Sequence, residues 1–126
     1  MNNELTSIPF QVTKDAIHKY AEITDDYNPL HLDDAFAEQT AMKGVIAHGT
    51  MSLSLIWQSL TATFGIEKTR DMSVTIRFKK PVRPGDALTA RGILRDDSPN
   101  TYNVWVENQD GQKVIEGKAE VKAPNA

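Results

Sequence analysis

The chain has 126 residues and a net charge of −3, and it contains no cysteine. This length allows one domain with a buried core but not two, and the lack of cysteine excludes disulfides and thiolate metal ligands. With 40% hydrophobic and 25% charged residues, the composition is that of a globular protein. The N-terminal residues lack the pattern of a signal peptide, and no stretch approaches the roughly 18 apolar residues of a membrane span. We therefore expect a single cytoplasmic domain over residues 1–126.

Charge is distributed unevenly along the chain. Residues 68–95 contain eight lysine or arginine residues against two acids, whereas the segments on either side are acidic. A basic segment in an acidic protein favours a local anionic partner over a nucleic acid. The alternative is that these charged side chains lie on a solvent-exposed face of a strand and bind no partner.

The N-terminal part begins with a strand expected over residues 7–12, followed by a helix that Thr13 caps. His18 falls on the polar side of this helix and is expected to have no role. The helical spacing that defines the apolar side comes from Ala16, Ile17, Tyr20, Ala21 and Ile23.

The next segment carries an acid and a base on either side of a proline. Asp26 and His31 are five residues apart, a spacing that would keep them from one site on a continuous helix. Pro29 denies Asn28 the helical region and predicts an extended or turned connector, which allows the carboxylate and the imidazole to converge. Taken alone, this stretch is also an ordinary turn sequence. Acids at 33–34 then offer an N-cap for a short helix over residues 35–39.

A long apolar helix is predicted over residues 49–64, and Gly65 ends it. Most of its remaining positions are serine or threonine, small enough for a sheet to close around the helix. A helix that is apolar on so much of its circumference belongs in the core. The apolar stripe is formed by Leu53, Ile56, Trp57, Leu60 and Phe64, and Met51 and Leu55 widen it.

After this helix the apolar residues recur at every second position and no longer at helical spacing. Alternating residues predict strands at 74–78, 87–94, 102–106 and 113–121, separated by turns rich in proline, glycine and asparagine. Residues 124–126 are expected to form a loose tail. One buried helix followed by consecutive antiparallel strands defines an α+β fold with the sheet wrapped around the helix. The edges of such a small sheet would be exposed, so a homodimer is expected.

The motifs resemble the signature of the MaoC-like dehydratase family, and among its members the (R)-specific enoyl-CoA hydratases. The resemblance rests on Asp26-x-Asn28-Pro29-Leu30-His31-x-Asp33, on the Ile-Ala-His-Gly sequence at 46–49 and on the basic residues 77–86. It covers most of the chain and implies a hot-dog fold whose sheets pair side by side in a dimer. Asp25 departs from the pattern, because many members have glycine there.

Hydration of an α,β-unsaturated thioester requires a base, an acid and a donor that stabilises the enolate oxygen. Imidazole exchanges protons near neutral pH, so His31 suits this role, and Asp26 can hold the same water, orient the imidazole or relay the proton. Gly49, as the first residue of a helix, offers an unpaired N–H and close access for a carbonyl. The resemblance implies syn hydration to the (R)-3-hydroxyacyl thioester. No cofactor is required beyond the coenzyme A or phosphopantetheine of the substrate.

Other polar and basic residues are candidates for substrate binding. Asn28 is expected to shape the loop, and His48 to pack against the loop at the start of the long helix or to serve as a second proton donor. The phosphates of coenzyme A or of a carrier-bound phosphopantetheine are expected near Arg77, Lys79, Lys80 and Arg83. A zinc site built from Asp26, His31, His48 and Asp33 has suitable ligand types but no known zinc spacing, so we expect no metal.

The acyl chain is expected to run along the long helix from Gly49. Leu53 and Trp57 lie one and two turns further on, and Trp57 either caps the acyl pocket or packs in the core. Two other functions remain open. A hot-dog thioesterase would need a carboxylate on or near the long helix, which has none between residues 49 and 64. A non-catalytic acyl-thioester-binding subunit would not need Asp26 and His31 together.

Overall fold

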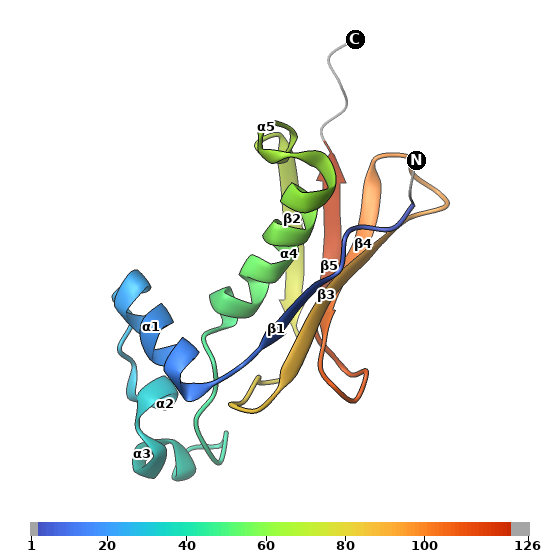
Figure 1. Ribbon diagram of the computed structural model, residues 1–126. Helices are drawn as coiled ribbons and strands as arrows, with labels where there is room; N and C mark the ends of the chain where they lie inside the picture. The colour runs from blue at the N-terminus through green and yellow to red at the C-terminus, as the bar shows by residue number, and fades with distance from the viewer. Residues whose placement is uncertain (1–2, 122–126) are drawn as a thin grey trace.

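The computed structural model describes residues 3–121, so the predicted tail at 124–126 lies outside the described part. The elements follow one another as a strand, five helices and four further strands (Figure 1). Their bounds are β1 Ile8–Gln11, α1 Lys14–Thr24, α2 Pro29–Leu32, α3 Asp34–Glu38, α4 Gly49–Phe64, α5 Ile66–Thr69, β2 Met72–Phe78, β3 Ala87–Leu94, β4 Thr101–Glu107 and β5 Lys113–Val121.

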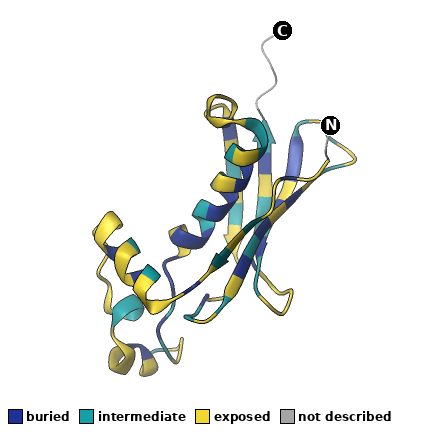
Figure 2. Ribbon diagram, in the orientation of Figure 1, coloured by how far each residue is buried: buried dark blue, intermediate teal, exposed yellow. Residues whose placement is uncertain are grey.

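The five strands form one antiparallel sheet in the order β1-β3-β4-β5-β2. Helix α4 lies across one face of this sheet, and its buried residues face the strands (Figures 1 and 2). The core joins that helix to inward-facing strand residues such as Leu88, Val104 and Ile115, each at most 1% exposed. The α+β architecture expected from the sequence is confirmed.

The buried face of α4 is rotated relative to the stripe expected from the sequence. Leu53, Trp57 and Phe64 are only half-buried, whereas Ser52 and Ser59 are fully buried. Small residues let the helix approach the sheet closely, so Ser52 and Ser59 share the buried face with Ile56 and Leu60. The full set of buried residues on α4 is Met51, Ser52, Leu55, Ile56, Ser59 and Leu60.

Helices α1, α2 and α3 lie beyond the sheet, beside the N-terminal end of α4 (Figure 1). The hydroxyl of Thr13 accepts a hydrogen bond from the N–H of Ala16 and caps α1 as predicted. Asp25 ends that helix in the left-handed region at φ 55°. Ile23 was expected on the apolar side of α1, but its side chain is 80% exposed. The fully buried residues of this helix are Ile17 and Ala21.

Two short helices were not predicted, and each begins at, or directly after, a residue that the sequence indicates as a break. Pro29 is the first residue of α2, and Gly65 caps α5. Proline is tolerated at the first helical position because no N–H partner is lost there. Among residues 3–121, no helix has the length and apolarity needed to cross a membrane.

Candidate active site

The connector between α1 and α3 folds the acid and the base towards each other. Asn28 adopts φ −54° and ψ 127°, an extended conformation of the kind expected before proline. Its side-chain oxygen accepts from the N–H of Leu30 at 3.0 Å and caps α2. One carboxylate oxygen of Asp26 accepts from the N–H of Asn28 at 3.3 Å. The single turn of α2 then carries His31 back towards Asp26, and Asn28 shapes the loop as expected.

His31 is oriented by a main-chain carbonyl. Its Nδ1 lies 2.8 Å from the carbonyl oxygen of Ile46. A carbonyl only accepts hydrogen bonds, so Nδ1 carries the hydrogen and donates it. The other ring nitrogen, Nε2, is therefore left with a free lone pair, the form of imidazole that takes up a proton.

His48 is 2% exposed and lies between the loop and the start of α4. Its Nε2 donates to the carbonyl oxygen of Asp26 at 3.0 Å, and its ring stacks on that of His31 with centroids 3.9 Å apart and an interplanar angle of 26°. The ring of Tyr20 covers another side at 5.1 Å. His48 thus packs against the loop, as one reading of the sequence predicted, and it also supports the base directly.

Asp26, His31 and His48 form one cluster, in which one polar atom from each residue lies within 4.8 Å of the others. Two hydrogen bonds of about 2.8 Å that meet at one water span about 4.6 Å, so a single water can join the carboxylate to the imidazole. Asp33 stands apart, because its carboxylate accepts from the N–H of Phe36 and caps α3.

The same cluster offers ligand types that suit a divalent ion. The two rings are stacked at an interplanar angle of 26°. Each ring also uses one nitrogen on a main-chain carbonyl.

A pocket of about 310 Å³ opens next to His31. Gly49 forms part of its wall as the first residue of α4, where the N–H has no partner within the helix. A Cβ atom on Gly49 would come within 2.9 Å of the Phe78 ring, so only glycine fits this wall unless the ring moves. Exposed Lys79 and Lys80 border the opening. The other lining residues are Met42, Ile46, Ala47, Ser52, Phe78, Pro81, Val82 and Ile115.

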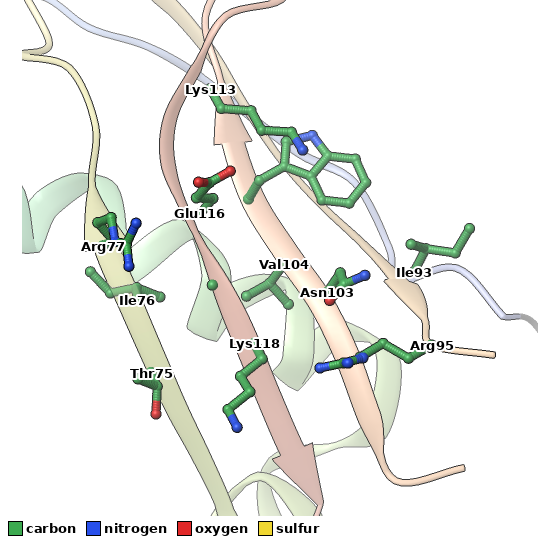
Figure 3. A pocket seen from close by; sticks show the side chains of 12 residues that line it. Thr75, Ile76, Arg77, Ile93, Arg95, Asn103, Val104, Lys113, Glu116 and Lys118 are labelled. Atoms are coloured by element: carbon green, nitrogen blue, oxygen red, sulfur yellow. The ribbon is translucent and has the colours of Figure 1, made fainter. Parts of the chain in front are cut away.

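The basic segment is divided between two faces of the molecule. Lys79 and Lys80 border the pocket described above, whereas Arg77 lies in a separate concavity of about 700 Å³ on the face of the sheet away from α4 (Figure 3). The Lys79 ammonium lies 3.4 Å from Glu116, which belongs to the second concavity. Arg83 donates to the carbonyl oxygen of Met42 and so supports the loop before α4.

Five predicted substrate-binding residues do not line the pocket at His31, namely Asn28, His48, Leu53, Trp57 and Arg77. Asn28 is exposed in the loop, and Leu53 and Trp57 are half-buried against the core. The pocket is lined instead by Ser52, which is not among the substrate-binding residues predicted from the sequence. Its spacing of three residues from Gly49 places it on the same face of α4, a signal that could have identified it.

Comparison with known proteins agrees with this arrangement. Residues 2–123 match the MaoC like domain family. The (R)-specific enoyl-CoA hydratase of Aeromonas caviae is 36% identical over 109 residues, covering 83% of this chain and 81% of that protein. Two solved structures are also similar. The unliganded R-hydratase PhaJ1 from Pseudomonas aeruginosa gives a TM-score of 0.79 at 28% identity and covers 100% of this chain and 83% of the other. The (R)-hydratase of A. caviae gives a TM-score of 0.78 at 30% identity and covers 98% of this chain and 96% of the other.

A sheet wrapped around one helix, with an acid and a base at the N-terminus of that helix, places this molecule among the hot-dog proteins. Within that class, the chain belongs to the MaoC-like dehydratase family.

Proposed function

We propose that this protein adds water across the double bond of trans-2-enoyl thioesters and forms (R)-3-hydroxyacyl thioesters, or catalyses the reverse dehydration. The observation that carries this proposal is the cluster in which Asp26 and His31 are close enough to share one water, beside a pocket walled by Gly49. The similarity to proteins named (R)-specific enoyl-CoA hydratase supports both the reaction and its stereochemistry.

The proposed reaction needs no group outside the protein, the substrate and water. Asp26 and the free Nε2 of His31 hold the water, and Nε2 takes its proton as the oxygen bonds to C3. The π electrons move towards the thioester, and the resulting enolate oxygen accepts from the Gly49 N–H at the positive end of α4. The proton then returns from the imidazolium to C2 on the same face, so hydroxide and proton add syn and His31 is regenerated.

The substrate carrier is proposed to be coenzyme A, or the phosphopantetheine of a carrier protein. Lys79 and Lys80 are the basic residues beside the catalytic pocket, so they are the candidates to bind its phosphates. Arg77 points into the other concavity and would meet a phosphate only along the outer face of the sheet.

A homodimer in the cytoplasm is proposed as the working form. Among the described residues 3–121, β2 is an edge strand with one side unpaired, and it ends at Phe78, which is 56% exposed beside the pocket. Pairing this edge with a second copy would satisfy the free main-chain groups and cover that ring. Light scattering coupled to gel filtration checks this, and a mass of one chain at micromolar concentration would contradict it.

The reaction is tested with crotonyl-CoA in buffer free of added metal and nucleotide. We expect the enoyl absorbance to fall without release of free thiol. We also expect chiral chromatography to show a product with the (R) configuration. Thiol released faster than the enoyl absorbance falls would assign a thioesterase instead. Unchanged signals with four-, six- and eight-carbon substrates would assign a non-catalytic binder.

A further inference from the structure

Ser52 is a buried hydroxyl that has no partner in this structure. It is 2% exposed, and within residues 3–121 only its Oγ and the Nδ1 of His48 are buried side-chain polar atoms without a hydrogen bond. Nearby hydroxyls on α4 are satisfied, since Ser54 donates to the carbonyl of Met51 and Ser59 to that of Thr6. An unpaired buried hydroxyl destabilises a fold, so this one needs an explanation.

The position of Ser52 points to a ligand as the missing partner. Ser52 lines the same pocket as Gly49 and His31, and the other lining residues away from the lysine rim are mainly apolar. Residues three apart on a helix are neighbours, and helical side chains lean towards the N-terminus of the helix. The Ser52 hydroxyl is therefore directed over the first turn of α4, which carries the free N–H of Gly49.

We propose that Ser52 is a second donor to the thioester carbonyl, acting with the N–H of Gly49 to hold the oxygen that becomes negative in the transition state. This inference rests on the proposed hydration and deepens it by assigning one more group to the substrate. Two donors that converge on one oxygen fix its direction, and the carbonyl in turn replaces the missing partner of the hydroxyl.

The test is Ser52→Ala, which removes only the hydroxyl. The carbonyl stretch of bound [1-¹³C]butyryl-CoA, a saturated thioester that cannot be hydrated, is recorded by isotope-edited infrared spectroscopy. Hydrogen bonds weaken the C=O bond, so the stretch lies below its solution frequency in the wild type and moves back towards that frequency in Ser52→Ala. With crotonyl-CoA, we expect kcat to fall about 10- to 10²-fold with little change in KM.

The melting temperature separates this role from a structural one. Removing an unpaired buried hydroxyl should leave the melting temperature unchanged or raise it by about 2–6 °C. Ser54→Ala is the matched control, because its hydroxyl bonds the helix main chain and lies outside the pocket. This control should alter neither the infrared frequency nor kcat.

Two results would overturn the role of Ser52. One is a bound carbonyl frequency that is the same in wild type and Ser52→Ala, and the other is a wild-type protein that does not bind butyryl-CoA. The proposed function fails separately, if wild type binds butyryl-CoA with a lowered frequency but does not hydrate crotonyl-CoA. In that case the infrared comparison still decides whether Ser52 bonds the carbonyl.

Discussion

The imidazole rings of His31 and His48 are stacked with their centroids 3.9 Å apart, although 17 positions separate the two residues in the sequence. The His31 ring is held on one face by this contact and at its edge by the carbonyl of Ile46. His48 is in turn fixed by the carbonyl of Asp26. The base therefore has a defined plane before any substrate arrives, which is the condition for efficient proton transfer.

His48→Ala should lower both stability and activity. It removes a buried ring, the support of His31 and the hydrogen bond to the Asp26 carbonyl, at a cost of about 2–4 kcal/mol in the free energy of unfolding. Misplacement of the base should reduce kcat about 10- to 10²-fold. Urea unfolding and steady-state kinetics on the same preparation check both effects. Unaltered stability would show that the stack and the hydrogen bond contribute little.

His31→Ala and Asp26→Asn should each lower kcat about 10²- to 10⁴-fold while the fold remains intact. If the two residues act on one water, the double variant should be little worse than either single variant. Circular dichroism and crotonyl-CoA hydration are the measurements. His18→Ala, on the exposed side of α1, is the control and should behave as wild type. Normal turnover in either single variant would remove that residue from the mechanism.

Lys79→Gln and Lys80→Gln should raise KM for crotonyl-CoA about 3- to 10-fold with kcat nearly unchanged, because exposed charges contribute to binding and not to chemistry. The wild-type KM should also rise with salt. Arg77→Gln, on the other face of the sheet, should leave KM unchanged. A KM increase in Arg77→Gln equal to that of the lysine variants would place the phosphates on the outer face.

Trp57→Ala tests whether this residue limits the acyl chain. Trp57 packs against the core and does not line the pocket at His31, so we expect a stability loss of about 1–3 kcal/mol, below the value for a fully buried aromatic. The ratio of kcat/KM for eight-carbon over four-carbon substrates should not change. A rise in that ratio would assign Trp57 to the end of the acyl pocket after all.

The sequence predicted the elements that local signals define. Helix α4 starts and ends where predicted, because Gly49 and Gly65 flank an uninterrupted apolar stretch. Strands β3 and β5 also have the predicted bounds, since turn residues separate alternating segments. The rotation of α4 could not be predicted, because a helix that is apolar around most of its circumference has no unique face to bury.

The site was predicted in part. The convergence of Asp26 and His31 followed from Pro29, yet the helical turn after that proline did not, because proline suits both an extended connector and a first helical position. The partners of His31 depend on tertiary contacts with residues 46 and 48, which no local pattern specifies. Strand alternation predicts that the basic residues divide between the two faces of the sheet. Which residue lies on which face follows only from the register of the strands.

His31 is anchored by the main-chain oxygen of Ile46, and the main-chain oxygen of Asp26 is anchored by the imidazole of His48. A carbonyl belongs to every amino acid, so the anchor of His31 does not depend on which side chain occupies position 46. Ile46 can therefore vary among residues that keep the backbone path, and Ile46→Val should leave the orientation of His31 intact. The orientation of His31 is in this way insulated from side-chain changes at position 46, which leaves that part of the pocket wall free to adapt to different acyl chains.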